Sequence, residues 1–482
     1  MKTIFLIALL SASSFAQNLS KPYVTPAAPQ FTDVERHTEL AHRRAAVTAK
    51  MADNSLLILT SAEPKIYTND VNYVFRQENN FFYLTGLKQK GSVLVIAKTN
   101  GRVTETLFLP ERIPSDETWN GHMYSRDEAK AIAGHVVIVD RESFDIWLSD
   151  VKKTRSVIRT AYLLKSLPDN SDDKTGEREF RQEHALAKTL AGYTIEDAGS
   201  LFSGLRQIKS PYEVKMLQHA IDITTEAQTR GWLAALNASM EYEVQAEVEY
   251  TFRRRNADYW AYPSIVGCGP NATTLHYEES QSPVTKGQLI LMDVGAEYEH
   301  YSADVTRTFP VNGKFTKEQA DIYQIVYDAQ EAVARASKPG ATFFDLNDAA
   351  DQVIKDGLFK LGLITDKNSA QYQTWYMHGF GHWLGMNVHD VSSSMTLAPG
   401  MTFTNEPGIY IRADALDNLP NTPENRAFIA KVRRAFEKYK NIGVRIEDDM
   451  LINATGVEWM TRRLPRKMSD IEAFMAANKL AH

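Results

Sequence analysis

Five side chains of metal-ligand type, each in a short segment of its own, constrain the C-terminal half of this chain. They are Asp293 in residues 289–296, Asp304 in residues 302–309, His382 at the end of His378-Gly-Phe-Gly-His382, Glu406 at the start of Glu406-Pro-Gly-Ile-Tyr410, and Glu447 in residues 443–449. Four carboxylates and one imidazole are the ligand set for two hard or borderline divalent ions that share a site. Such a pair of ions activates water near neutral pH, so the set predicts hydrolytic chemistry.

The two aspartates have the spacing that a shared site needs. Residues 289–309 predict two strands, and a turn at Tyr298-Glu299 sets Asp293 opposite Asp304. Opposed Cβ atoms lie about 4.5–5.5 Å apart, and paired metal ions lie about 3.5–4 Å apart. Apolar neighbours direct both carboxylates toward a core, where metal or protonation must offset the buried charge. Alone, the segment is equally consistent with a surface hairpin carrying two solvated aspartates, but the other three segments favour the metal site.

Histidines surround this ligand set in the sequence. His378 and His382 are four residues apart, as in a helical zinc pair, but Gly379 and Gly381 each cost about 1 kcal/mol inside a helix. The segment therefore predicts a tight turn that enters a strand. His389 follows along the same strand or loop. A lone residue such as His276 is more often structural, although it precedes the strand that carries Asp293.

Together these segments resemble a known family. His378-Gly-Phe-Gly-His-Trp-Leu-Gly385, Glu406-Pro-Gly-Ile-Tyr410 and Val444-Arg-Ile-Glu-Asp-Asp449 are similar to motifs of the two-domain, dimetal pita-bread peptidases, and Phe75-Arg-Gln-Glu-Asn-Asn-Phe-Phe-Tyr-Leu-Thr-Gly86 resembles their N-terminal signature. Within them the chain is most similar to Xaa-Pro aminopeptidases (aminopeptidase P), with prolidases close behind. The resemblance implies an α/β (α+β) chain in which an N-terminal α/β creatinase-type domain, residues 32–185, precedes a pita-bread catalytic domain, residues 206–465.

The same resemblance implies a role for each site residue. Asp304 and Glu447 would bridge two divalent ions, Asp293 would complete one ion, and His382 and Glu406 the other. Glu406 would also be the general acid and base toward a metal-bridged hydroxide. His276 and His389 would contact the substrate carbonyl and the oxyanion, and His378 and Arg445 would orient the ligands. The family typically uses manganese, and the oxygen-rich ligand set agrees with that metal.

Composition and the N-terminus bound the remaining properties. The net charge of -6 argues against nucleic-acid or anionic-membrane partners, and short basic runs such as Arg253-Arg-Arg255 are expected to be solvated helix faces. Residues 1–16, with Lys2, a short apolar run and Ser14-Phe-Ala16, predict a secretory signal peptide and hence a periplasmic or secreted protein without a membrane span after signal removal. Cys268, the one cysteine, excludes an intrachain disulfide and is expected to be buried filler. The resemblance implies a homo-oligomer, a dimer or tetramer.

The segment between Tyr410 and Gly443 leaves the substrate length open. It predicts a helix over residues 424–439, and Arg426 lies near the position of a prolidase arginine that binds the carboxylate of a dipeptide. An exposed helical arginine is the alternative reading. The leading expectation is a secreted aminopeptidase acting on peptides with proline in the second position, and the alternative is an Xaa-Pro dipeptidase (prolidase). A catalytically inactive peptide-binding protein or a creatinase-like amidine hydrolase ranks lower, because all five ligand positions are filled.

Overall fold

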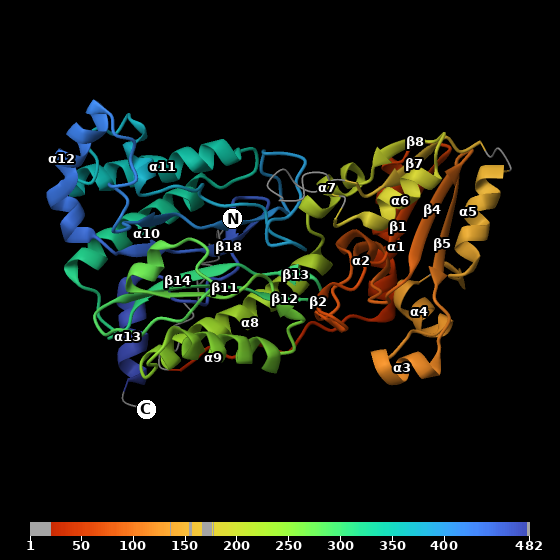
Figure 1. Ribbon diagram of the computed structural model, residues 1–482, viewed down its shortest axis with the longest axis horizontal. Helices are drawn as coiled ribbons and strands as arrows, with labels where there is room; N and C mark the ends of the chain where they lie inside the picture. Colours follow the sequence, from red (N-terminus) through yellow and green to blue (C-terminus); the bar gives the residue numbers. More distant parts are fainter. Residues whose placement is uncertain (1–20, 135, 154–156, 166–175, 177, 480–482) are drawn as a thin grey trace, which may run out of the picture.

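Two lobes lie side by side in the computed structural model, which describes residues 21–134, 136–153, 157–165, 176 and 178–479 (Figure 1). The smaller lobe holds the N-terminal half of the chain, and the larger lobe the C-terminal half. The predicted order of an N-terminal α/β domain and a C-terminal mixed domain is therefore confirmed. The predicted signal peptide, residues 1–16, lies outside the described residues.

A six-stranded mixed sheet with helices around it forms the N-terminal domain. Its strand order is β6-β5-β4-β1-β7-β8, and a separate β2-β3 hairpin precedes α2. The apolar runs that begin near residues 55 and 92 form β1 and β4, which pair antiparallel. The elements are α1 (Asp33–Lys50), β1 (Ser55–Thr60), β2 (Ile66–Thr68), β3 (Val71–Asn72), α2 (Asn79–Thr85), β4 (Val93–Thr99), β5 (Arg102–Leu109), α3 (Pro114–Asn120), α4 (Arg126–Ala133), β6 (Val137–Asp140), α5 (Ser143–Lys153), β7 (Thr160–Leu163), α6 (Arg181–Thr189), β8 (Thr194–Asp197) and α7 (Gly199–Gln207).

Short antiparallel strands, covered by long helices, form the catalytic domain. Its small sheets have the orders β10-β11-β14, β13-β12-β9, β15-β18-β19 and β16-β17. The elements are α8 (Pro211–Ala235), α9 (Glu241–Arg254), β9 (Tyr259–Trp260), β10 (Ile265–Cys268), η1 (Gly269–Thr273), β11 (Leu289–Val294), β12 (Ala296–Tyr298), β13 (Tyr301–Ser302), β14 (Val305–Pro310), α10 (Lys317–Ala336), α11 (Phe343–Leu361), η2 (Ala370–Thr374), β15 (Thr402–Asn405), β16 (Gly408–Tyr410), α12 (Pro423–Tyr439), β17 (Gly443–Arg445), β18 (Asp448–Ile452), β19 (Val457–Trp459) and α13 (Met468–Asn478).

Capping residues fix where the long helices of the catalytic domain begin. Ser210 and Glu213 form a capping box at α8, with Pro211 in the first turn, and Thr316 with Gln319 forms another at α10. These pairs satisfy backbone N–H groups that the first helical turn leaves without partners. Helix α12 also matches the helix predicted over residues 424–439.

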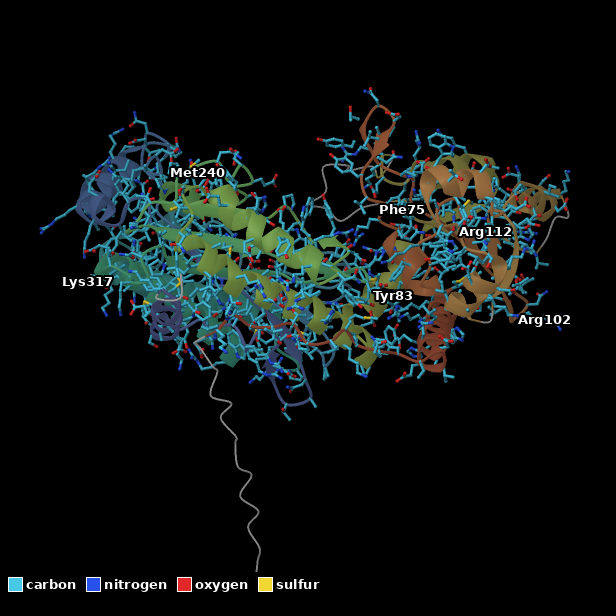
Figure 2. The ribbon with its side chains drawn as sticks, turned by 90° about the horizontal axis from the view of Figure 1, so that it is seen from below. Phe75, Tyr83, Arg102, Arg112, Met240 and Lys317 are labelled. Atoms are coloured by element: carbon cyan, nitrogen blue, oxygen red, sulfur yellow. The ribbon has the colours of Figure 1, made fainter. Side chains whose placement is uncertain are left out.

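The lead-in segment, residues 21–31, attaches the start of the chain to the catalytic domain. Thr25 donates hydrogen bonds from its backbone N and its Oγ1 to Glu226 Oε2 of α8, at 2.8 and 2.7 Å. Glu226 is fully buried and also pairs with Arg230 and Arg255. The N-terminal domain begins only after this attachment, at α1. Figure 2 shows the N-terminal domain around Tyr83 and Arg112, and the catalytic domain around Met240 and Lys317.

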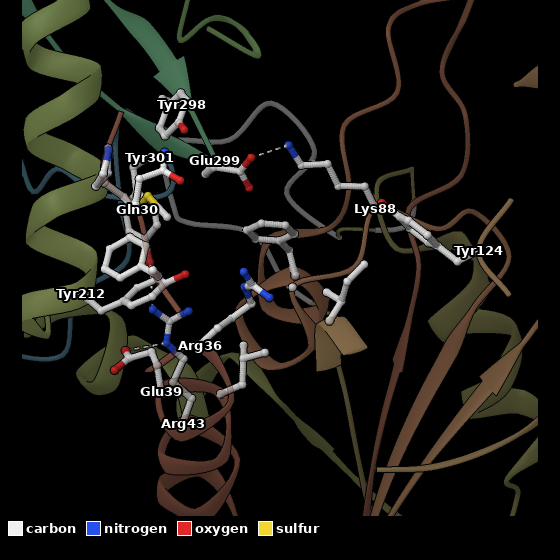
Figure 3. Close-up of a pocket in the computed structure, with 17 residues that line it drawn as sticks. Gln30, Arg36, Glu39, Arg43, Lys88, Tyr124, Tyr212, Tyr298, Glu299 and Tyr301 are labelled. Carbon is white, nitrogen blue, oxygen red and sulfur yellow. Dashed lines mark hydrogen bonds and ion pairs between the residues drawn. The ribbon is translucent and has the colours of Figure 1, made fainter. Parts of the chain in front are cut away.

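A cavity of about 410 Å³ lies where the lead-in segment, α1 and the β12-β13 hairpin meet (Figure 3). Aromatic rings and charged groups line it, and Lys88 and Arg43 are each paired there with a carboxylate, Glu299 and Glu39 respectively. None of the five candidate metal ligands lines this cavity. Within the described residues, no helix is both long enough and apolar enough to cross a membrane.

Candidate metal centre

Strand ends and tight turns carry the five candidate ligands. Asp293 lies on β11, Asp304 lies between β13 and β14, and Glu447 lies between β17 and β18. Glu406 directly follows β15, and His382 precedes Trp383, which bridges to Phe403 of β15. The expectation that His378 to His382 form a turn and no helix is confirmed. Gly381 is required in that turn, because a Cβ there would lie 1.9 Å from the carbonyl oxygen of Thr404.

All five candidate ligands belong to one network of contacts, here called the five-residue cluster. His382 Nε2 lies 3.3 Å from both Asp304 Oδ2 and Glu406 Oε1. Asp304, His382 and Glu447 each offer a ligand atom within 4.8 Å of the others. The Tyr262 hydroxyl lies 2.5 Å from Asp293 Oδ1 and 2.6 Å from Asp304 Oδ1, and so joins the two aspartates.

The predicted register of the two aspartates is wrong, although the side chains do meet. Asp293 lies opposite Thr306, and Tyr298 pairs with Tyr301, so the turn is Glu299-His300. Both turn residues have positive φ, 48° and 67°, as in the two-residue turns that match strand twist. The strands also break at Gly295, where a Cβ would lie 1.9 Å from the Ala303 carbonyl oxygen. This break lets Asp304 turn toward Asp293 across the strand pair.

Burial and mutual repulsion of the carboxylates dominate the electrostatics of the cluster. Burial and the neighbouring Asp293 raise the pKa of Asp304 to about 6, against a lowering by the hydrogen bond with His382. Burial and the charges of Asp304 and Glu406 raise the pKa of Glu447 well above its usual value. Burial alone would lower the pKa of His382, but Asp304 and Glu406 raise it to about 9. Each acid thus lies in a field that favours a bound cation.

A second layer of side chains holds the cluster in place. Arg445 pairs with Asp293 Oδ2 and donates a hydrogen bond of 2.8 Å to the Tyr410 hydroxyl. His378 Nε2 lies 2.8 Å from the same hydroxyl, and its Nδ1 lies 4.0 Å from Glu406. The Thr306 hydroxyl donates to Glu447 at 2.6 Å. His378 and Arg445 therefore lie beside the ligands, as the resemblance implies.

The two other histidines lie on the exposed side of the cluster. The rings of His389 and His382 are 4.2 Å apart between centroids and nearly perpendicular. Desolvation, with the charge of His382 next, lowers the pKa of His389 to about 4, and His276 contributes to the same lowering. Both His276 and His389 are exposed, so they can meet a substrate that approaches the cluster.

Several side chains of this centre carry no signal in the sequence. Tyr262, in the loop after β9, and Thr306 of β14 contact candidate ligands directly. Tyr410 of β16 contacts His378 and Arg445. Tyrosine and threonine are common core and strand residues, and no spacing relates Tyr262 to Asp304. Arg426 of α12 is exposed and donates to Asn421 Oδ1 at 2.7 Å, so its contact is local to its own segment.

The residues fit a divalent metal centre. Four carboxylates and one imidazole face one another, and Arg445 is the only arginine or lysine that the structure pairs with any of them in the described part of the chain. Unpaired buried carboxylates are costly, and a divalent ion offsets that cost.

Family models match both lobes of the chain. The model of metallopeptidase family M24 matches residues 215–454, and the model of the aminopeptidase P N-terminal domain matches residues 40–159. The fold and the five-residue cluster thus define a metallopeptidase, a hydrolase whose family implies divalent metal ions.

Relatives resemble this chain over most of its length. The Xaa-Pro aminopeptidase of Haemophilus influenzae is 34% identical over 91% of this chain and 97% of the relative, and that of Escherichia coli is 33% identical over 91% and 98%. The solved structure of aminopeptidase P from E. coli with the inhibitor Pro-Leu matches with a TM-score of 0.78 at 30% identity, covering 94% of this chain and 100% of that one. The chain belongs to the aminopeptidase P family.

Proposed function

We propose that this protein is a secreted dimetal aminopeptidase that hydrolyses the bond between an N-terminal residue and proline. The observation that carries the proposal is the five-residue cluster, in which five ligand-type side chains from distant segments contact one another. The names of the relatives support the substrate class, because the H. influenzae and E. coli proteins are Xaa-Pro aminopeptidases.

Each site residue has a role in this proposal. Asp304 and Glu447 would be ligands of both ions, Asp293 of one, and His382 and Glu406 of the other, with manganese as the metal that suits this ligand set. When bound, the ions supply Lewis-acid chemistry that activates water and polarises the scissile carbonyl. Glu406, near the protein surface and 4.0 Å from His378, moves the proton from water to the leaving amine.

The exposed histidines act on the substrate in this proposal. His389 and His276 lie on the open side of the cluster and donate hydrogen bonds to the carbonyl oxygen as negative charge develops on it. The lowered pKa of His389 favours the neutral ring, which still has one N–H to donate. Arg445 orients Asp293 by direct pairing, and His378 lies beside Glu406. The Tyr410 hydroxyl joins Arg445 to His378.

A comparison of two peptides tests the substrate class. Metal-free protein should hydrolyse neither an Xaa-Pro-Xaa tripeptide nor the matching Xaa-Pro dipeptide, and added Mn²⁺ should restore hydrolysis of the tripeptide. Asp304→Ala should bind fewer than two ions per chain by metal analysis. Dipeptide hydrolysis without tripeptide hydrolysis would instead establish the prolidase alternative, which the exposed position of Arg426 does not favour.

Export and assembly complete the proposal. Residues 1–16 act as a signal peptide, so the mature protein from the periplasm or medium should begin after Ala16 by N-terminal sequencing. The mature chain forms a homo-oligomer, a dimer or tetramer, whose mass light scattering would measure. An intact N-terminus would contradict the signal peptide. A monomer at micromolar concentration would contradict the homo-oligomer.

A further inference from the structure

A buried glutamine joins the two chain segments that carry Asp293 and Asp304. Gln228 lies in the middle of α8 and is fully buried. Its side-chain Nε2 donates to the carbonyl oxygen of Met292 at 3.1 Å and to that of Val305 at 2.7 Å. Met292 directly precedes Asp293, and Val305 directly follows Asp304. One amide group therefore hydrogen-bonds to both main-chain segments, at the residue next to each aspartate.

A second buried glutamine does the same for Glu406 and Glu447. Gln330 lies in α10 and is also fully buried. Its Nε2 donates to the carbonyl oxygens of Asn405 and Ile446, at 3.1 and 3.2 Å, and also to Asp448 Oδ2 at 2.7 Å. These residues directly precede Glu406 and Glu447. Asn405 Nδ2 returns a bond of 2.9 Å to the Gln330 carbonyl oxygen, which fixes the helix against this strand pair.

The two glutamines share a hydrogen-bonding pattern that packing alone would not require. In each, a side-chain NH₂ group donates to carbonyl oxygens of two different ligand-bearing segments, which come from sheets that α8 and α10 cover (Figure 1). The NH₂ group of Gln330 is shared with Asp448 Oδ2, on the strand that follows Glu447. An apolar side chain would fill the same volume but would leave these carbonyl oxygens without that donor. Gln228 Oε1 has no hydrogen-bond partner in the described residues. The N–H donors of Gln228, and not its acceptor, therefore explain why a glutamine occupies this position.

We propose that Gln228 and Gln330 are positioning residues of the metal centre, each setting the separation of one pair of ligands. The inference rests on the proposed two-metal function and goes beyond it by naming how the protein fixes the ligand spacing. Gln228 controls the pair Asp293 and Asp304, and Gln330 controls the pair Glu406 and Glu447. Loss of Gln228 should therefore affect most the ion that Asp293 completes, and loss of Gln330 the ion that His382 and Glu406 complete.

Metal titration of the full-length protein tests this inference. Methionine matches glutamine in length and flexibility but has no donor. Mn²⁺ titrated calorimetrically into metal-free Gln228→Met and Gln330→Met should bind about 10- to 100-fold more weakly than to wild type, the usual effect of losing a partner that orients a ligand. In each variant one of the two binding steps should weaken more than the other. Circular dichroism of the metal-free proteins verifies that they fold.

A control on the same helix separates positioning from general packing. Gln218 of α8 also donates to a main-chain oxygen, that of Met460 at 3.1 Å, but Met460 is not adjacent to a ligand. Gln218→Met should bind Mn²⁺ like wild type. If Gln228→Met does not fold, Gln228→Asn keeps the amide and withdraws it by one methylene, and it should show the same weakening.

The outcomes distinguish this inference from the proposed function. Folded glutamine variants that bind Mn²⁺ within twofold of wild type would overturn the inference, as would equal weakening in Gln218→Met. In either case Asp304→Ala still reports on the metal centre itself. If Asp304→Ala binds two ions with wild-type affinity, the two-metal assignment fails instead.

Discussion

His389 is the side chain whose proposed role separates catalysis from metal binding. Its ring contacts His382 without being one of the five candidate ligands. Because the proposed hydrogen bond forms to charge that develops in the transition state, His389→Ala should lower kcat and kcat/KM together, by roughly 10²–10³-fold, as for the loss of one oxyanion donor. Metal content, measured by elemental analysis, should stay at the wild-type value. A change in KM alone would show that His389 only holds substrate.

Arg426, in contrast to His389, is expected to contribute little to catalysis. Its guanidinium is exposed and bonds to Asn421 in its own segment, so Arg426→Ala should change kcat/KM by less than about twofold, in keeping with the small effect of exposed polar contacts. The measurement is hydrolysis of an Xaa-Pro dipeptide and an Xaa-Pro-Xaa tripeptide by both proteins. A selective loss of dipeptide hydrolysis would show that Arg426 reads a substrate carboxylate.

Residue types and segments predicted the members of the centre, and the family resemblance implied His378 and Arg445 beside them, but the rest of its support was not predicted. The five candidate ligands lie in segments whose glycines and apolar neighbours favour tight turns and buried strands. Each ligand joins the five-residue cluster. The register of Asp293 and Asp304 was missed because Glu299-His300 lacks the Asn-Gly or Asp-Gly signal of a two-residue turn. Tyr262, Gln228 and Gln330 act through contacts between elements far apart in sequence, and no local pattern records such contacts.

At the scale of an element, α6 carries a buried acid against the end of β1. Glu183 is 3% exposed and accepts a hydrogen bond from Thr60. Desolvation raises its pKa from 4.5 to about 7. A raised pKa means that the folded protein holds this proton more tightly than the unfolded chain, so the contribution to stability is complete below pH 4.5 and is lost as the pH rises through about 7.

Glu183→Gln should remove that dependence, because the amide keeps the shape and never ionises. At pH 8 the variant should unfold at a higher urea concentration, by up to roughly 3 kcal/mol in free energy of unfolding, and at pH 4 it should gain nothing. Glu179→Gln, which removes the charge of the exposed ion pair with Lys65, is the control and should alter the free energy of unfolding at neither pH. An equal effect at both pH values would mean that folding does not raise the pKa of Glu183.

At the scale of the whole molecule, the two domains should respond differently to metal removal. The five-residue cluster lies within the catalytic domain, and cations that bind only the folded state stabilise it, by about 2.7 kcal/mol at a free concentration 100 times Kd. In calorimetric unfolding, a chelator should therefore lower the transition temperature of the catalytic domain and leave that of the N-terminal domain unchanged. Asp304→Ala should show no difference between chelator and Mn²⁺. One transition that shifts as a unit would show that the domains unfold together.

The buried cysteine of β10 can report local opening of the protein. Cys268, the single cysteine of the chain, is 3% exposed on β10, and this strand pairs with β11 beside Asp293. A thiol reagent can reach Cys268 only when that strand pair separates, so the modification rate under native conditions measures how often the sheet bearing Asp293 opens. No other thiol competes for the reagent. Any ligand that steadies this sheet will therefore be detected as slower labelling, without a probe having to be engineered into the protein.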